Sequence, residues 1–126
     1  MRSRSRRPND AEARLTPVVF HTLLALAGGP LHGYAISQSA EEASGGSVRM
    51  GPGSLYGSLQ RMAAAGLLRE VSPPEDAQGA HAHRRRYYEL TDLGRERLVA
   101  EARLLEGEVG VLRARGLLGA DRGAQS

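Results

Sequence analysis

Hydroxyl and guanidinium side chains form two groups in the middle of the chain. Ser54, Ser58 and Arg61 recur at helical spacing, and short hydroxyls let a helix approach base edges that bulky aliphatic side chains would hold it away from. Arg84 and Arg85 follow in a second segment, where a guanidinium suits a phosphate or the minor groove. Together the two groups predict contact with double-stranded DNA, and an ordinary solvated helix face is the alternative for the first group.

A predicted helix from Pro52 to about Ala65 carries the first group. Three apolar residues recur along it at i, i+4 and i+7, which gives one buried stripe and turns the hydroxyls and the arginine toward the other side. The stripe consists of Leu55, Leu59 and Met62. Tyr56 has two open interpretations, because its ring can pack in the core while its hydroxyl meets a DNA phosphate.

The second group belongs to a predicted β-hairpin. Alternation along its return strand places Tyr88 and Leu90 on the core side. Arg84 and Arg85 lie nearest the hairpin tip, so they are the predicted phosphate or minor-groove contacts. The hairpin is expected to consist of a strand at 67–71, a turn-rich loop at 72–80 and a return strand at 84–90.

Two further helices are predicted before these elements. Thr16 followed by Pro17 is the N-cap and first-turn arrangement that opens a helix, and residues 28–30 stop it. A second short helix begins within residues 31–36, and His32 is expected to support its start. This order of helices followed by a basic hairpin predicts a winged helix-turn-helix.

A trailing helix is predicted over residues 92–115, with Thr91 and Asp92 at its cap. Apolar residues recur along it in steps of four and three, the a/d pattern of a coiled coil. Because a winged domain already has its own core, this seam calls for the same helix of a second copy. Gly107 and Gly110 each weaken a helix by roughly 1 kcal/mol relative to alanine, so fraying or bending is expected there. The predicted dimerisation residues are Leu98, Ala102, Leu105, Val109 and Leu112.

The composition excludes several classes of protein. A chain of 126 residues suits one compact domain with an appendage. It has no cysteine, which excludes disulfides, thiolate zinc sites and a cysteine nucleophile. The longest apolar stretch, residues 17–27, is far short of the ~20 residues that a membrane span requires. We therefore expect a cytoplasmic protein without a membrane partner.

The sequence also predicts no catalytic, cofactor or metal site. His81 and His83 would need a third ligand such as Glu75 or Asp76 to hold a metal, and loop histidines without a fixed scaffold are usually solvated. The chain has no phosphate-cradling glycine loop followed by lysine, and no Ser, His and acid set that the fold would bring together. No enzymatic activity is expected.

Four blocks of sequence resemble the PadR family of bacterial transcriptional regulators. They are residues 31–36, residues 53–61, residues 66–68 and residues 86–95. The resemblance implies a homodimer of winged helices, usually a repressor, joined mainly through the trailing helix and often helix one. It further implies that some members release DNA when a small molecule binds. The single trailing helix is similar to the shorter branch of the family, whereas Gly57 stands where the family commonly has proline.

These observations predict a fold that is mainly α with a small antiparallel β-hairpin, a winged helix-turn-helix plus a C-terminal dimerisation helix. The predicted function is a sequence-specific DNA-binding transcriptional regulator, a dimeric repressor of a promoter operator that a small-molecule effector releases. The alternative is a winged-helix protein–protein interaction module without specific DNA binding. The expected domains are a disordered basic tail at 1–14, the DNA-binding domain at 15–91, the dimerisation helix at 92–115 and a disordered tail at 116–126.

Overall fold

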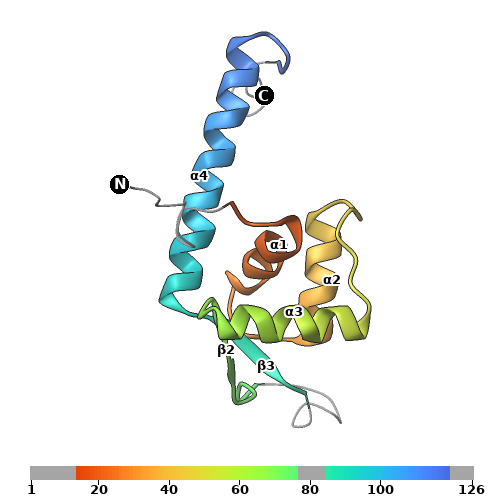
Figure 1. The fold of residues 1–126 in the computed structure, drawn as a ribbon. Helices are drawn as coiled ribbons and strands as arrows, with labels where there is room; N and C mark the ends of the chain where they lie inside the picture. The colour runs from red at the N-terminus through yellow and green to blue at the C-terminus, as the bar shows by residue number, and fades with distance from the viewer. Residues whose placement is uncertain (1–13, 77–84, 120–126) are drawn as a thin grey trace, which may run out of the picture.

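The computed structural model describes residues 14–76 and 85–119. Three helices gather over a small antiparallel sheet, and a fourth, longer helix projects beyond them (Figure 1). Within the described ranges the sheet has three strands in the order β1-β3-β2. The predicted class, mainly helical with a small antiparallel sheet, is confirmed. The elements are α1 (Pro17–Leu26), β1 (Leu31–His32), α2 (Gly33–Ala43), α3 (Pro52–Ala64), β2 (Leu68–Val71), β3 (Tyr87–Leu90) and α4 (Asp92–Ala114).

Hydroxyl caps begin two of the helices. The Thr16 side chain accepts a hydrogen bond from the backbone N–H of Val19 at 3.2 Å, and Pro17 follows at the first helical position. The Thr91 hydroxyl accepts from the N–H of Gly94 at 3.0 Å. Each bond satisfies one of the amides that a helix start leaves unpaired. Both predicted caps are confirmed.

The sheet contains a strand that the sequence did not reveal. Residues 31–36 were expected to begin a helix, but Leu31 and His32 are extended and pair with Tyr88 and Tyr87 of β3. Two residues are too few to show an alternating pattern, so only the tertiary pairing identifies this strand. The short β1 makes β3 the central strand and ties the start of α2 to the hairpin.

The core lies between the helices and one face of the sheet. Tyr88 and Leu90 of β3 are buried in it, as alternation along the strand predicts. Tyr87 points to the opposite face and is nevertheless buried, and its ring meets the ring of His32 edge-on with 5.5 Å between centroids. The remaining buried members of the cluster are Leu23, Leu26, Ile36, Leu55, Leu59, Met62, Leu67, Leu68 and Leu98.

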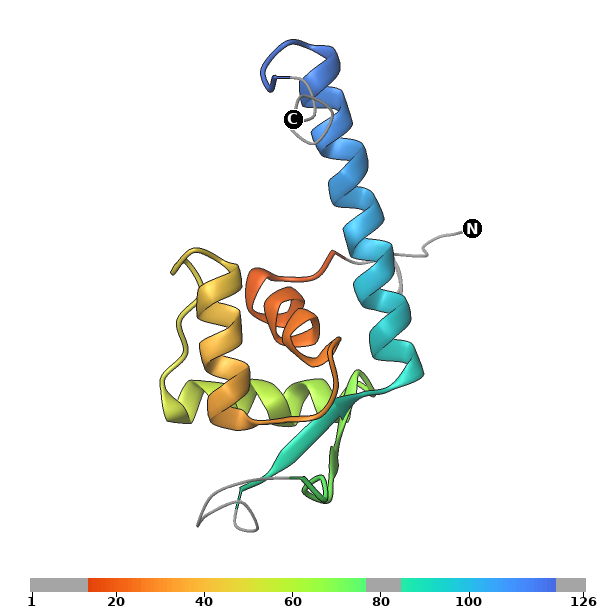
Figure 2. The same ribbon diagram turned by 180° about the vertical axis from the view of Figure 1, so that it is seen from behind.

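Helix α4 packs on the domain only along its first part. Leu98 is just 8% exposed and belongs to the core of the same chain, so its assignment to a free dimerisation seam is wrong. Farther along, Leu105 is 37% exposed and Leu112 40% exposed. The helix runs unbroken through Gly107 and Gly110, in contrast to the expected fraying. In Figure 2 this later part extends away from the other helices.

Arg14 fastens the N-terminal segment to α4. Its guanidinium lies 2.7 Å from a carboxylate oxygen of Glu101 and 2.6 Å from one of Glu108. The Glu101 carboxylate is buried and also accepts from the backbone N–H of Leu15 at 3.0 Å. Arg14, which the sequence assigned to a tail at 1–14, is the first residue that the structure describes. The rest of the first tail, residues 1–13, lies outside the described residues, as do residues 120–126.

Candidate nucleic-acid interface

One flank of α3 lies toward α1 and is only partly open to solvent. Ser58 is 9% exposed, and its hydroxyl accepts a hydrogen bond from Arg61 at 3.2 Å. The predicted outward position of Ser58 is therefore wrong. The reason is visible in the spacing, because position 58 lies three residues after Leu55 and four before Met62, on the buried stripe itself. Ser54 and Arg61 are exposed but lie along the same flank as Ser58.

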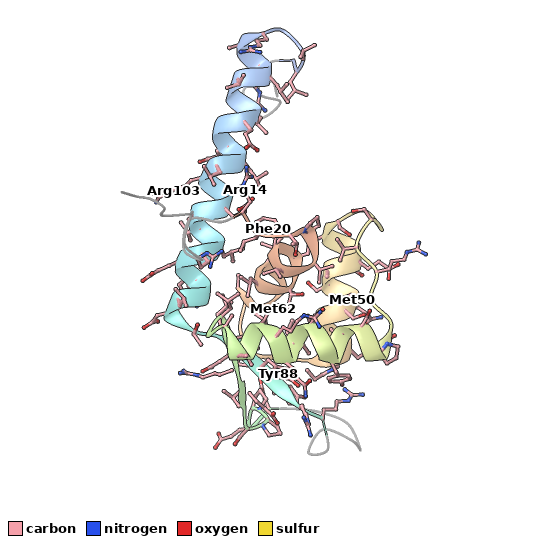
Figure 3. The ribbon with its side chains drawn as sticks, viewed as in Figure 1. Arg14, Phe20, Met50, Met62, Tyr88 and Arg103 are labelled. Carbon is pink, nitrogen blue, oxygen red and sulfur yellow. The ribbon has the colours of Figure 1, made fainter. Side chains whose placement is uncertain are left out.

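That flank borders a cavity of about 520 Å³ between α1 and α3. Its walls are mostly apolar, with Ser54, Ser58 and Arg61 as polar groups on the α3 side. Figure 3 shows Met62 between α1 and α3, and Tyr88 on the other side of α3. The other lining residues are Thr16, Val18, Val19, Met62, Ala65 and Leu67.

A second hollow lies where α3 meets β3, at the base of the hairpin. It has a volume of about 390 Å³ and is lined by Tyr56, Gln60, Arg85, Arg86 and Tyr88. Two arginines, an amide and two phenol rings are the groups that proteins use for phosphate and base-edge contacts. This hollow combines the predicted recognition helix and the predicted wing in one surface. We call it the helix–wing hollow.

The sequence reasoning missed Gln60 as a member of this surface. Gln60 is exposed and lies five residues after Leu55, on the side of α3 away from the buried stripe. An amide can pair with adenine through two hydrogen bonds. The helical spacing that defines the buried stripe also defines the opposite face of α3, and Gln60 lies on that face. This signal was present in the sequence.

Tyr56 lies across the start of α2. It is 42% exposed, and a Cβ added at Gly33 would lie 2.9 Å from its hydroxyl oxygen. Glycine at position 33 therefore leaves the space that the Tyr56 ring occupies. The ring is partly packed and also lines the helix–wing hollow. Contact of its hydroxyl with a DNA phosphate stays a prediction.

Arg85 extends from the start of the wing toward β1. Its Nη1 lies 3.0 Å from Nε2 of His32, and Nδ1 of the same ring lies 3.2 Å from the backbone N of Ala35. His32 is thus the N-cap of α2, which confirms its predicted support of that helix. Burial, and next the charge of Arg85, lower the pKa of His32. Arg84, the other predicted wing contact, lies outside the described residues.

Tyr88 forms the floor of the helix–wing hollow. Burial, and next the charge of Glu70, raise its pKa, and Arg86 hydrogen-bonds its side chain. The phenol is therefore neutral at physiological pH. On the outer side of the hairpin, Arg69 of β2 pairs with Glu89 of β3 at 2.6 Å, an exposed pair that adds little stability.

The structure describes only some of the residues on which the metal and membrane predictions depend. His81 and His83 lie outside the described residues. Within residues 14–76 and 85–119, no three His, Cys, Asp or Glu side chains gather as metal ligands. No helix in the same ranges has the length and hydropathy to cross a membrane.

Comparison with known proteins identifies the family of this chain. The model of the transcriptional regulator PadR-like family matches residues 22–100. An uncharacterized 37.1 kDa protein in transposon TN4556 of Streptomyces fradiae is 46% identical over 96 residues, which cover 76% of this chain and 23% of that protein. The chain therefore spans about a quarter of the length of this relative.

Solved structures share the fold at low sequence identity. A PadR family transcription regulator from hypervirulent Clostridium difficile R20291 has a TM-score of 0.63 and 22% identity, over 79% of this chain and 97% of that one. Bacillus subtilis PadR, solved in complex with operator DNA, has a TM-score of 0.55 and 23% identity, over 70% of this chain and 46% of that one. These structures show the shared fold, and the family model, which matches more than half of the chain, shows the family. The chain belongs to the transcriptional regulator PadR-like family.

Proposed function

We propose that this chain is a dimeric, sequence-specific repressor that places α3 in the major groove and rests its wing on the adjacent phosphates. The observation that carries the proposal is the helix–wing hollow, where Gln60 of α3 and Arg85 and Arg86 of the wing line one surface. An amide on an exposed helix face can read a base edge, and guanidinium groups beside it can bind the backbone. The Bacillus subtilis relative is bound to operator DNA in its solved structure, which supports the same partner here.

The dimer is proposed to form through the later part of α4. This helix has 23 residues and is therefore about 35 Å long at 1.5 Å per residue. Beyond its contact with α1, large apolar side chains remain exposed on it: Leu104, Leu105, Val111 and Leu112. Ala102, just before them, and Val109, among them, also belong to the predicted seam. Burying this stripe against a second copy would present two α3 helices about 34 Å apart, one turn of DNA.

Release by a small molecule is the third part of the proposal. The 520 Å³ cavity has apolar walls and the polar groups of Ser54 and Arg61 at one side, which suits a small molecule with an apolar body and a polar end. A molecule there would touch both α1 and α3. It would release DNA only by binding more tightly to the DNA-free arrangement of these helices.

The rival function is a winged-helix module that assembles protein complexes without reading DNA. Titrations of duplex DNA from the chain's own promoter, at several salt concentrations, distinguish the two. We expect Gln60→Ala to relax sequence preference, and Arg85→Ala to weaken binding to all sequences and reduce the salt slope by about 1. Arg103→Ala, on the exposed side of α4, is the matched control and should change neither. If Gln60→Ala and Arg85→Ala bind DNA as the unaltered chain does, the regulator proposal fails and the rival is favoured.

A further inference from the structure

The ring of His32 has two hydrogen-bond donors aimed at it. The backbone N–H of Ala35 lies 3.2 Å from Nδ1, and Nη1 of Arg85 lies 3.0 Å from Nε2. A backbone amide and a guanidinium can only donate. Both contacts therefore require the imidazole to accept a hydrogen bond, one at each nitrogen.

A single imidazole cannot accept both bonds. The neutral ring has one acceptor nitrogen and one N–H, and the protonated ring has no acceptor. Because burial and the charge of Arg85 lower the pKa of His32, the ring is neutral at physiological pH. With the proton on Nε2 the ring caps α2 and turns an N–H toward Arg85. With the proton on Nδ1 it holds Arg85 and leaves the Ala35 amide without its cap.

We propose that His32 is a positioning residue that couples the wing to the start of α2 by changing tautomer. In the DNA-free protein the ring accepts from Arg85 and holds that side chain beside the helix–wing hollow. When a DNA phosphate binds Arg85, the ring proton leaves Nδ1 for solvent while another is taken up at Nε2, with no net change in charge. The freed Nδ1 then caps α2. This inference rests on the proposed function, because it takes DNA as the ligand that removes Arg85.

The surroundings of the ring favour such an exchange. A phosphate is charged, so its hydrogen bond to a guanidinium is stronger than one from neutral imidazole. Arg85 lines the hollow that DNA would cover, so the side chain that contacts His32 is also one that a bound phosphate would meet. The edge-on ring of Tyr87, 5.5 Å away between centroids, keeps the imidazole plane in place. Both nitrogens therefore keep their directions while the proton changes position.

Nitrogen-15 NMR of the histidine rings tests the inference directly, with the His32 signals assigned by their loss in His32→Asn. In the DNA-free protein we expect a measurable population with the proton on Nδ1. Arg85→Ala without DNA, and the unaltered chain with bound DNA, should both shift His32 to the form with the proton on Nε2. Hydrogen exchange of the Ala35 amide should slow several-fold in both cases. Arg103→Ala should leave the tautomer and the exchange unchanged.

Two outcomes would overturn the inference. The first is the same tautomer in the DNA-free chain and in Arg85→Ala, because the coupling would then be absent. The second is slower exchange of the Ala35 amide in the double variant His32→Asn, Arg85→Ala than in His32→Asn alone. Asparagine caps the helix by itself and has no ring to release, so the coupling predicts no difference between these two variants. The Arg85→Ala comparison needs no DNA, so a failure of the proposed function would leave its result interpretable.

Discussion

Two glycines of α4 have opposite roles, and alanine substitution separates them. Gly94 is buried in the first turn of the helix. A Cβ there would lie 2.9 Å from the carbonyl carbon of Leu67 and far inside contact with the carbonyl oxygen, whereas nonbonded atoms prefer about 3.5–4.0 Å. Because these atoms of Leu67 belong to the backbone, a methyl group at position 94 can be accommodated only if α4 moves away from them. That movement also strains the 3.2 Å hydrogen bond from the Thr91 N–H to the same oxygen.

These terms give the expected magnitude for Gly94→Ala. Overpacking costs about 1–3 kcal/mol, and a weakened hydrogen bond adds about 1 kcal/mol. The higher helix propensity of alanine relative to glycine offsets about 1 kcal/mol of this loss. The net expectation is a loss of about 1–3 kcal/mol in the free energy of unfolding. For a chain of this size that lowers the Tm by about 4–15 °C.

Gly107→Ala is the matched control on the same helix. Nothing lies within 4 Å of a Cβ at Gly107. Gly107 is about two and a half helical turns after Leu98, so it lies on the opposite side of α4. Alanine there should raise the unfolding free energy by about 0.5–1 kcal/mol. Thermal unfolding followed by circular dichroism, at one fixed protein concentration, measures both variants. A Gly94→Ala chain as stable as the unaltered one would refute the close packing of α4 on residue 67.

Three further predictions concern other contacts. Gly33→Ala should cost under about 1 kcal/mol in the same unfolding assay, because the atom it meets is the movable end of Tyr56; a loss as large as that of Gly94→Ala would contradict this. Replacing both Leu105 and Leu112 by glutamate should give folded monomers in sedimentation velocity, and persistent dimers would place the interface elsewhere. Glu101 has a lowered pKa, chiefly through its partner arginine, so its contribution to stability is present above about pH 5 and is lost as pH falls. Glu101→Gln should therefore flatten the acid side of the stability profile, and an unchanged slope there would argue against the ion pair.

The helix boundaries were predictable because local chemistry determines them. Thr16 and Thr91 each accept a hydrogen bond from an amide three residues ahead, a pattern written in consecutive residues. The stripe of α3 was predictable for the same reason, since its three apolar members recur at fixed helical intervals. The resemblance of four sequence blocks to the PadR family supported the order of these elements along the chain.

Burial of individual side chains was harder to predict, because it depends on elements distant in sequence. The helical spacing puts Ser58 on the buried stripe, but it does not show that Ser58 borders a cavity between α1 and α3. Leu98 fits a coiled-coil seam by its spacing, but it packs into the core of its own chain. The contact of Arg85 with His32 joins residues 53 positions apart. Only the three-dimensional arrangement brings such pairs together.

The central claim is that two copies of α3 and its wing read DNA as a symmetric pair, and selection from a pool of random duplexes tests it most directly. The purified chain should enrich an inverted repeat whose half-sites are centred about 10 base pairs apart, one turn of the helix. Enrichment of no common sequence, or of a single half-site with no symmetry mate, would contradict the account.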